Sequence, residues 1–551
     1  MTGLLRIALC FTALTVSQAI VSAQPPEPAQ AASPIPATPS LPEVIASLLS
    51  RPDVARDHWG IAVTALDDTP IFSLNENQLF QPASNTKLFT TAAAMALLGP
   101  QRRFTTRVTG TLNPSTGIVN GDLTLIGAGD ANLDSEDLPY IAPANRPKPA
   151  VPHQPNPMHD INDLVAQLVA KGVKEVRGDI VGDDTLFPWE PYPQEWSIDD
   201  AIWGYGAPVG ALTIQDNELR LSIAPGATAG QPATITLEQA VPYYTVQNET
   251  RTVATKAQAT GVQVDRRIGS RTLRLYGSIA LDDETDVEHI AIEDPAQYAA
   301  MVLRAALLDH GIAVTGTARA RHQLASDATG FLTALHAPSK AKDQPPFTDG
   351  IESTCSVPSL LSPVLATHES APLFENVDFT NKVSQNLHAE LLLHHLGGIN
   401  CGNNSTAEGA RVIRQFLLKA GIDPNDFIFL DGSGLSSHDL VTPRAIARLL
   451  SYAAHDPQTG QPQPWFSAWK ASLPIGGEDG SLASRFPNSP LKDHVFAKTG
   501  TLGEARALSG YLDCASGRTV IFSVLDGNHL PGTSADREAI DHIVAAIQAT
   551  Q

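Results

Sequence analysis

The first hundred residues pair two short apolar runs with one longer helical run. Residues 58–63 and 70–74 read as two strands around a turn at Asp67-Asp68. A strongly helix-forming segment then runs from Ser84 to Leu98, and Gly99-Pro100 stops it. Ser84 is expected to be the N-cap of this helix, since serine readily accepts from the first free backbone N–H groups.

From about residue 105 to 335 the pattern changes to short β-like runs with few helices. Glycine and aspartate bound strand-like runs at 121–126 and 178–182, and residues 220–290 alternate Thr, Val and Ile with polar side chains. One clear helix is predicted at 297–309. The stretch 337–372 contains Pro, Ser and Lys and is predicted to be a loop.

Past residue 380 the helical periodicity returns. It predicts helices at 383–396, 406–420 and 442–454, two strands near 505–525 and a closing helix at 534–549. No repeat of fixed period is present in the sequence. The mixture of strands and helices predicts an α/β (α+β) fold.

Composition adds size and charge to this picture. The chain has 551 residues, of which 42% are hydrophobic and 17% charged, and this length corresponds to three or four domains. The formal net charge is −21 and the pI is near 5.1. Nucleic acid and anionic lipid are therefore poor candidates for the main partner, because both require clustered Lys and Arg. An anionic ligand would have to meet a local basic spot.

The N-terminus resembles a cleavable export signal. Arg6 provides a positive charge, residues 7–16 are apolar, and Val21-Ser22-Ala23 offers small residues for cleavage. Residues 1–23 are therefore predicted to be a signal peptide and 24–42, rich in Pro and Ala, a flexible tether. Export to the periplasm is expected, and no later segment is long and apolar enough to be transmembrane.

Cysteine and histidine positions give no metal or cofactor site. Three cysteines, Cys355, Cys401 and Cys514, would remain after export, and none has zinc-finger spacing. One disulfide is possible in an oxidising compartment, and the pairing is open. His388, His394 and His395 surround Glu390 in one predicted helix, but not at ligand spacing, so packing is the expected role. Neither a cofactor nor a metal is predicted.

A Ser-x-x-Lys pattern occurs three times, at Ser84–Lys87, Ser339–Lys342 and Ser467–Lys470. The second lies in a polar loop that would not hold a nucleophile rigid, and the third has no downstream partners in the right order. The first opens an apolar helix, which places Ser84 and Lys87 on one face. A hydroxyl at a helix N-terminus also has backbone N–H groups beside it that could stabilise an oxyanion.

Two further short motifs follow in order. Ser384-Gln385-Asn386 precedes a predicted helix, and Lys498-Thr499-Gly500 precedes a predicted strand. Ser-x-Asn alone is weak, since Ser73-Leu74-Asn75 matches it too, whereas Lys-Thr-Gly occurs once. The ordered trio is typical of the penicillin-recognising serine acyltransferases.

More narrowly, the chain resembles the class C low-molecular-mass penicillin-binding proteins, the D-alanyl-D-alanine carboxypeptidase/endopeptidase family (peptidase family S13). The resemblance covers about 42–551. It is carried by the segments 82–87, 121–123 with 127–130, 205–209, 431–436 and 497–502.

The resemblance implies a penicillin-binding-protein/β-lactamase-like transpeptidase domain with a helical subdomain, interrupted by two inserted β-rich domains. The insertion explains the 300 residues (384 − 84) between the first two motifs. The expected division is a catalytic domain at 43–105 and 365–551, inserted domain II at 106–218 and 290–335, inserted domain III at 219–289, and a loop at 336–364.

The motifs suggest catalytic roles for four side chains. Ser84 is the expected nucleophile, and a serine hydroxyl needs an adjacent base. Lys87 fits that role if burial and repulsion by Lys498 lower its pKa towards neutrality. Ser384 can relay a proton to the leaving amine, and Asn386 can hold Lys87 and the substrate amide.

The remaining roles concern substrate binding. Lys498 and Thr499 suit the terminal carboxylate of a peptide, and this is the local basic spot that an acidic protein requires. Gly500 is expected to let the substrate backbone lie close to the strand. The family's oxyanion hole corresponds to the backbone N–H groups of Ser84 and Thr501.

Recognition of the substrate side chain is implied by the family alone. Members that read a diaminopimelate side chain use an acid and an aromatic residue that correspond to Asp200 and Tyr205. An arginine and a glutamine that some members add are Ser437 and Gly503 here. An amino-group contact is therefore retained while a carboxylate contact is missing, and looser specificity is expected.

The sequence thus predicts a serine-type D-Ala-D-Ala carboxypeptidase or DD-endopeptidase that acts on peptidoglycan peptides and is inhibited covalently by β-lactams. Two alternatives stay open: a β-lactamase-like hydrolase with fast deacylation, and a non-catalytic cell-wall-binding scaffold. No nucleic-acid partner is expected, and the oligomeric state is open.

Overall fold

The computed structural model describes residues 39–134, 138–146, 158–324, 330–336, 362–399 and 403–551. The predicted signal peptide and nearly all of the tether lie outside these residues. Residues 41–551 form one unit, separate from residues 1–40. Within the described part of the chain, no helix combines the length and the apolar character that crossing a membrane requires.

A five-stranded antiparallel sheet in the order β2-β1-β22-β21-β20 is the base of the active region. Its strands are β1 (His58–Ala65), β2 (Pro70–Leu74), β20 (Val495–Leu502), β21 (Ala505–Asp513) and β22 (Thr519–Gly527). Six consecutive residues of β1 are buried, so both faces of the sheet are covered at this strand. Strand β20 forms one edge.

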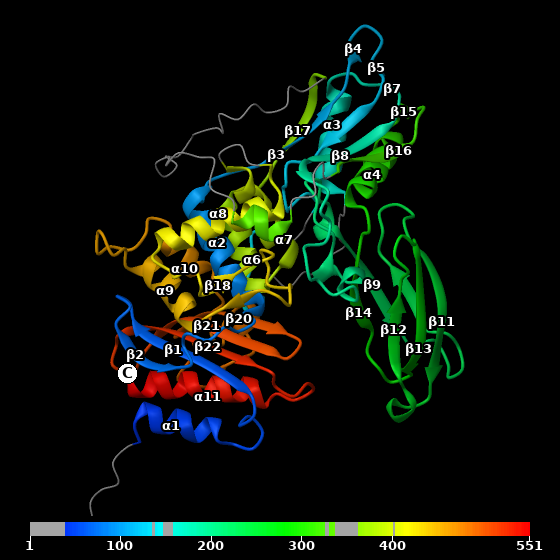
Figure 1. Ribbon diagram of the computed structural model, residues 1–551. Coiled ribbons are helices and arrows are strands. Elements are labelled where there is room, and N and C mark those ends of the chain that lie inside the picture. The colour runs from blue at the N-terminus through cyan, green and yellow to red at the C-terminus, as the bar shows by residue number, and fades with distance from the viewer. Residues whose placement is uncertain (1–38, 135–137, 147–157, 325–329, 337–361, 400–402) are drawn as a thin grey trace, which may run out of the picture. The chain divides into compact units, whose positions relative to one another are not determined.

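Helices cover this sheet on both sides (Figure 1). On one face lie α1 (Leu41–Leu49) and α11 (Ala535–Thr550), whose apolar residues join the sheet in one core. The other core includes α2 (Thr86–Leu97), α6 (Leu373–Val383), α7 (Asn386–Gly397), α8 (Thr406–Lys419), α9 (Pro443–Ala454) and α10 (Phe466–Ser472). Helix α2 is buried over ten consecutive residues, 86–95, which fixes the helix behind Ser84.

The segment between α2 and α6 adds two sheets. One has the order β16-β8-β6-β3-β17 and the other β15-β7-β5-β4. These strands are β3 (Thr105–Thr109), β4 (Leu112–Asn113), β5 (Ile118–Asn120), β6 (Leu123–Ile126), β7 (Glu175–Arg177), β8 (Ile180–Pro188), β15 (Ala313–Val314), β16 (Ala318–Gln323) and β17 (Val364–Glu369).

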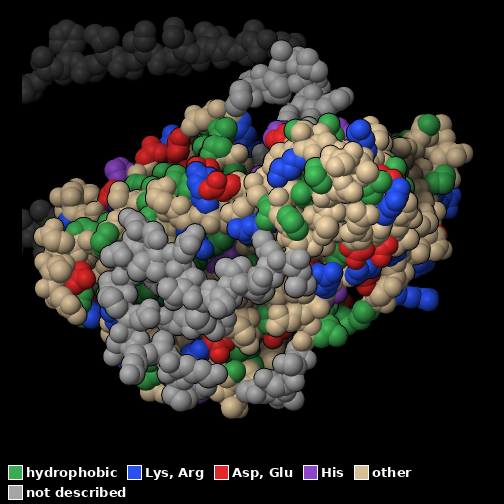
Figure 2. Space-filling model, turned by 90° about the horizontal axis from the view of Figure 1, so that it is seen from above, with side chains coloured by type: hydrophobic (Ala, Val, Ile, Leu, Met, Phe, Trp, Pro, Cys, Tyr) green, Lys and Arg blue, Asp and Glu red, His purple; other side chains and the backbone are tan. Residues whose placement is uncertain are grey.

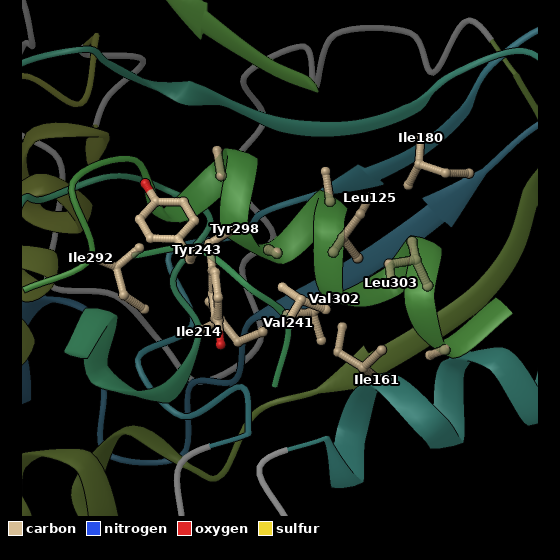
Figure 3. Close-up of a cluster of buried hydrophobic side chains, with 14 of the residues drawn as sticks. Leu125, Ile161, Ile180, Ile214, Val241, Tyr243, Ile292, Tyr298, Val302 and Leu303 are labelled. Carbon is tan, nitrogen blue, oxygen red and sulfur yellow. The ribbon is translucent and has the colours of Figure 1, made fainter. Parts of the chain in front are cut away.

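Helices α3 (His159–Ala170) and α4 (Pro295–Asp309) pack against these strands. Figure 3 shows Tyr298, Val302 and Leu303 of α4 in a core with Leu125 of β6 and Ile161 of α3. All five side chains are fully buried.

Two three-stranded sheets, β10-β9-β14 and β11-β13-β12, occupy the predicted β module. Their strands are β9 (Glu218–Ala224), β10 (Thr234–Leu237), β11 (Thr245–Val253), β12 (Gly261–Asp265), β13 (Thr272–Ala280) and β14 (Asp286–Ala291). The short elements α5 (Phe331–Leu335), β18 (Phe427–Ile428) and β19 (Leu440–Val441) complete the described part. The domain boundaries given above stay a prediction.

Most predicted elements are present, and a few differ from the prediction. Residues 364–369 were expected in a loop but form β17, which pairs with β3 and not with a sequence neighbour. Helix α3 was missed although Ile161, Leu164, Val165 and Leu168 follow helical spacing. The helix predicted at 383–396 is α7, which begins three residues later, and the preceding helix α6 was missed. Helices α1 and α10 were also missed.

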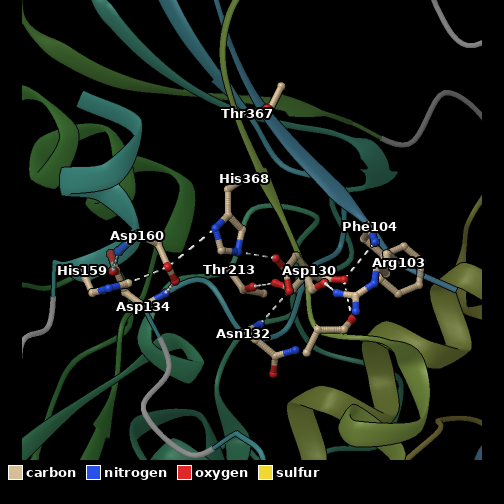
Figure 4. Close-up of polar contacts among 12 residues, drawn as sticks. Arg103, Phe104, Asp130, Asn132, Asp134, His159, Asp160, Thr213, Thr367 and His368 are labelled. Carbon is tan, nitrogen blue, oxygen red and sulfur yellow. Dashed lines mark hydrogen bonds and ion pairs between the residues drawn. The ribbon is translucent and has the colours of Figure 1, made fainter. Parts of the chain in front are cut away.

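A polar cluster holds β17 in place (Figure 4). His368 on β17 lies 3.3 Å from an Asp130 oxygen and 3.6 Å from an Asp160 oxygen. Burial opposes protonation of His368, but Asp130 and the nearby Asp160 outweigh it and raise its pKa. The segment 127–130, which carried part of the family resemblance, is thus anchored to the sheet rather than to the catalytic residues.

The described surface carries charges of both signs (Figure 2). In Figure 2, Lys and Arg side chains are interspersed with Asp and Glu over the described residues of the face drawn. Cys514 is buried and not in a disulfide among the described residues, whereas Cys355 and Cys401 lie outside them.

Candidate active site

The three predicted motifs meet at one place. Ser84 lies in a 3₁₀ turn, Ala83–Asn85, that leads into α2, and Lys87 lies in the first turn of α2. Ser84 is therefore not the N-cap of α2 as predicted, because Asn85 occupies that position. Ser384 and Asn386 stand at the α6–α7 junction. Lys498 lies within β20, not before a strand.

Lys87 is at the centre of this arrangement. Its Nζ lies 3.0 Å from Ser84 Oγ, 2.6 Å from Asn386 Oδ1 and 2.7 Å from the Ser433 carbonyl oxygen. The Asn386 amide oxygen and the Ser433 carbonyl oxygen can only accept hydrogen bonds. A neutral amine would use its two N–H groups for these oxygens, and its lone pair would then face the Ser84 hydroxyl. This is the geometry that a general base needs.

The electrostatics of Lys87 favour the neutral amine near neutral pH. Its side chain is fully buried, and burial lowers its pKa to about 7. Three carboxylates, Asp431, Glu390 and Asp439, oppose this shift, in that order. The expected repulsion by Lys498 is not among the causes for Lys87, so burial carries the shift.

These carboxylates also build the loop opposite Lys87. Glu390 accepts from the N–H groups of Gly432 and Ser433, and Asp431 accepts from those of Gly434 and Ser436. The loop 431–436 is thereby held so that the Ser433 carbonyl oxygen faces Lys87. Burial raises the pKa of Glu390 to about 8. The sequence assigned no role to Glu390, and only the tertiary contact shows that it holds the loop.

Lys498 is tied to Ser384. Its Nζ donates to Ser384 Oγ at 2.8 Å and to the Thr499 carbonyl oxygen at 3.1 Å. Burial, assisted by the charge of Lys87, holds the pKa of Lys498 well below its usual range. Ser384 has a φ of 66°, in the left-handed region that non-glycine residues rarely adopt. This backbone conformation turns the chain between α6 and α7 and presents the hydroxyl to Lys498.

Gly500 serves a different purpose from the one expected. A Cβ at this position would lie 2.6 Å from the Pro82 carbonyl oxygen and 3.2 Å from Ala83 Cβ. The missing side chain lets the Ser84 turn approach β20, so glycine brings nucleophile and strand together. Gly434 meets the same turn from the loop 431–436, where a Cβ would fall 1.9 Å from the Ala83 carbonyl oxygen.

The outer edge of β20 carries the predicted carboxylate-binding groups. The Ala497 N–H donates to the Pro474 carbonyl oxygen on the side away from β21. Alternate residues of a strand point the same way, so the N–H groups of Thr499 and Thr501 face that side too. The hydroxyl of Thr499 hydrogen-bonds Ser481, and Arg506 donates to the Thr501 hydroxyl at 3.1 Å. Arg506 was not singled out in the sequence.

A pocket of about 350 Å³ opens in front of Ser84. It is lined by Ser84, Asp200, Tyr205, Ser384, Asn386, Gly434, Leu435, Thr501, Leu502 and Gly503. Asp200 and Tyr205 therefore lie in the same pocket as the motif residues. The Tyr205 hydroxyl donates to Asp200 at 3.0 Å, and burial raises the pKa of Asp200.

Asn386 joins the two sides of the pocket. Its Nδ2 donates to the Tyr205 carbonyl oxygen at 2.8 Å while its Oδ1 accepts from Lys87. An amide group has two N–H donors, so one remains for a substrate.

The other sequence candidates lie elsewhere. Ser467 is exposed on α10, and Ser339 is outside the described residues. His388 is buried against Asp216 at 3.0 Å, and His395 contacts the Gly129 carbonyl oxygen at 2.9 Å, as expected for packing. Gly503 lines the pocket, whereas Ser437 does not.

Comparison with known proteins decides the family. The model of the D-Ala-D-Ala carboxypeptidase 3 (S13) family matches residues 41–338 and 349–550. The chain belongs to this family. The chain is 30% identical over 513 residues to a D-alanyl-D-alanine carboxypeptidase of an Actinomadura species, covering 91% of this chain and 83% of that one. It is 25% identical to the penicillin-sensitive carboxypeptidase A of Dictyostelium discoideum, covering 88% and 86% of the two chains.

The fold agrees with this family. The crystal structure of penicillin binding protein 4 (dacB) from Haemophilus influenzae superposes with a TM-score of 0.72 at 21% identity, covering 91% of this chain and 98% of that one. A second structure of that protein, described as complexed with a novel β-lactam, superposes with a TM-score of 0.67. The predicted family, fold class and enzyme class, a serine-type D-Ala-D-Ala carboxypeptidase, are confirmed.

Proposed function

We propose that the chain cleaves D-Ala-D-Ala termini of peptidoglycan peptides through an acyl-enzyme on Ser84, and that penicillins acylate the same hydroxyl. The observation that carries the proposal is the position of Lys87 Nζ, 3.0 Å from Ser84 Oγ and held by two fixed acceptors. A buried lysine with a pKa of about 7 is half neutral at neutral pH and can take a proton.

The acylation step uses the groups around the pocket. Ser84 Oγ bonds to the carbonyl carbon between the two D-alanines, and its proton passes to Lys87 Nζ. Charge on the carbonyl oxygen would be met by the N–H groups of Ser84 and Thr501. The bond to the terminal D-alanine then breaks, and its nitrogen receives a proton through Ser384. Water completes the cycle by hydrolysing the ester.

The terminal carboxylate of the substrate would lie near Lys498, Thr499 and Thr501. Binding an anion there favours the charged form of Lys498, whose pKa burial lowers. The substrate backbone would run along the outer edge of β20, where Thr499 and Thr501 offer free-facing N–H groups.

Asp200 and Tyr205 would receive the amino group of the substrate side chain. None of the ten described residues that line the pocket is an arginine or a lysine, so a side-chain carboxylate has no cation to pair with there. We expect weak discrimination between substrates that differ only in that carboxylate. Steady-state kinetics on such a pair would test this, and a large preference for the carboxylate form would contradict it.

A second cavity beside the first supports endopeptidase activity as well. This cavity, of about 530 Å³, shares Tyr205, Ser384 and Asn386 with the first and extends to Trp203 and Glu288. Because Ser384 serves the leaving amine, this cavity could hold the second peptide of a cross-link. Cleavage of a cross-linked dimer, followed by mass spectrometry of the two products, would test it.

The place of action would be the periplasm, where peptidoglycan is exposed. The predicted signal at 1–23 supports this, and N-terminal sequencing of the mature protein from a Gram-negative host would check cleavage after Ala23.

Incubation with a labelled penicillin tests the main proposal against its alternatives. A long-lived adduct on Ser84, absent in Ser84→Ala and retained in Ser467→Ala, supports the carboxypeptidase. Rapid turnover of the penicillin would indicate a β-lactamase-like hydrolase. A chain that forms no adduct and releases no D-alanine would be a scaffold.

A further inference from the structure

A second group of buried ionisable side chains lies where β22 meets α11, away from the pocket. Asp526 is in β22, His529 is in the turn that follows, and Asp536 is in the first turn of α11. Their exposed fractions are 0%, 4% and 1%. One potential ligand atom from each lies within 4.8 Å of the others. We call these three residues the Asp526 cluster.

Several atoms of this cluster are buried without a hydrogen-bond partner among the described residues. They are both carboxylate oxygens of Asp526, Nδ1 of His529 and Oδ1 of Asp536. Burial of an unpaired charge or polar atom is costly, and folded proteins rarely leave such atoms without a partner. Four such atoms converge here from three residues.

Contacts within the cluster do not remove this cost. His529 Nδ1 lies 3.4 Å from Asp526 Oδ2, and His529 Nε2 lies 3.8 Å from Asp536 Oδ2, both longer than ordinary hydrogen bonds. Arg506 donates to Asp536 Oδ2 at 2.6 Å, which leaves Oδ1 as the buried oxygen of Asp536 without a partner among the described residues.

From this geometry we propose that the Asp526 cluster binds a divalent cation of the zinc class. Asp526, His529 Nδ1 and Asp536 Oδ1 supply the ligands. A tetrahedral zinc ion at about 2.1 Å from its ligands holds neighbouring ligand atoms about 3.4 Å apart, so the His529–Asp526 separation already fits. Imidazole with carboxylate is a ligand set that such ions accept.

Asp57, just before β1, is a third carboxylate near the cluster, although it is not one of the three residues whose ligand atoms lie within 4.8 Å of one another. Asp57 is half-buried. Burial is the largest cause that raises the pKa of Asp526, and the charge of Asp57 is the second largest. Structural zinc sites usually have four protein ligands. With Asp57 the cation would connect β22 and α11 to β1, which is distant in the sequence but pairs with β22.

The cation would be structural and take no part in the reaction. Arg506 contacts Asp536 on one side and the Thr501 hydroxyl on the other, at 2.6 and 3.1 Å. A cation that fixes Asp536 therefore also fixes the side chain next to the end of β20.

A second group, His159, Asp160 and Asp163, has similar spacing but includes two exposed side chains. Exposed carboxylates are already solvated, so this group has no need of a cation. It provides a matched control.

The test measures zinc content and unfolding on the full chain with any purification tag removed. Protein is saturated with Zn²⁺, dialysed against metal-free buffer and assayed by elemental analysis. Thermal unfolding is then recorded with and without a chelator. We expect about one zinc per chain and a melting temperature that falls by about 3 °C or more with chelator. Asp526→Asn should retain no zinc and show no chelator response, whereas Asp163→Asn should behave as the wild type.

The proposal is overturned if the wild type retains no zinc and melts identically with chelator, or if Asp526→Asn and wild type retain equal zinc. Should Asp526→Asn not fold, His529→Gln replaces it, and the wild-type chelator arm decides independently. Penicillin labelling of Ser84 is read separately, so failure of the metal site and failure of the proposed function are distinguishable.

Discussion

Two buried groups of charges, one around Lys87 on α2 and one where β22 meets α11, are satisfied in different ways. Around Lys87, the Glu390 and Asp431 carboxylates accept from the backbone of the loop 431–436, and no buried atom of these three side chains lacks a partner among the described residues. In the Asp526 cluster several atoms have none. The first group sets a pKa with protein groups alone, while the second requires something from outside the chain. Arg506 connects the two regions, since it contacts Asp536 of the Asp526 cluster and the Thr501 hydroxyl at the pocket.

Removal of the central amine should have the largest effect. Lys87→Met takes away the base, so the second-order rate of acylation by penicillin should fall about 10³-fold, within the range for a lost general base. Lys470→Met is the matched control, because Lys470 belongs to the unused Ser-x-x-Lys pattern on α10. An equal loss of acylation rate in both variants would contradict the role of Lys87 as the base.

Displacement of the nucleophile should come next. In Gly500→Ala the new Cβ meets the Pro82 carbonyl oxygen and pushes the Ser84 turn away from β20. Acylation should slow by about 10²-fold, the size expected of a misplacement near 1 Å. Gly517→Ala, in the hairpin between β21 and β22 and outside the pocket lining, meets no atom within 4 Å but has a φ of +85°. It should therefore lower stability by about 1 kcal/mol with little change in acylation.

Loss of one loop carboxylate should act on both stability and pH dependence. Asp431→Asn keeps only one accepting oxygen, so the backbone N–H group of Gly434 or of Ser436 loses its acceptor and unfolding should become easier by about 1–3 kcal/mol. It also removes a charge that raises the pKa of Lys87, so the midpoint of the pH–acylation curve should move to lower pH. Asp426→Asn, which breaks only the pair with Arg444, should leave the midpoint in place. A midpoint that rises in Asp431→Asn would contradict the assignment.

The smallest effect is expected at the connection between the two groups. Arg506→Gln removes a positive charge beside Asp536, so Zn²⁺ should bind more tightly to the Asp526 cluster, by less than about tenfold. Acylation should change less than in the other variants, since Arg506 meets the residues of the pocket through the Thr501 hydroxyl. Calorimetric titration with Zn²⁺ measures the binding, and penicillin kinetics measure the acylation. Weaker Zn²⁺ binding in Arg506→Gln would contradict the expected effect of Arg506 on the Asp526 cluster.

The sequence predicted the motif residues because their chemistry is encoded in short, ordered segments. Ser84 and Ser384 each stand at a boundary of a helix, whereas Lys498 lies within β20 and is marked by the Lys-Thr-Gly motif alone. It also predicted strands and helices with strong periodicity, such as β22 and α11. Weakly patterned elements were missed, and β17 exists only because β3 pairs with it.

Residue roles that depend on tertiary contacts could not be predicted from the sequence. Glu390 is one side chain of an apolar helix until the loop 431–436 folds onto it. Gly500 carries no sign that Pro82 approaches it. The Asp526 cluster combines a strand end, a turn and a helix start, so its spacing forms no motif.

The pH dependence of Ser84 acylation tests the central claim most directly. A neutral Lys87 is the proposed base, so the active form lies above its pKa. Labelled-penicillin acylation rates, measured from about pH 5 to about pH 10, should rise with pH, pass a midpoint near 7 and then level off. A rate that does not change over this range, or that rises only near the ordinary lysine pKa of 10.5, would contradict the account.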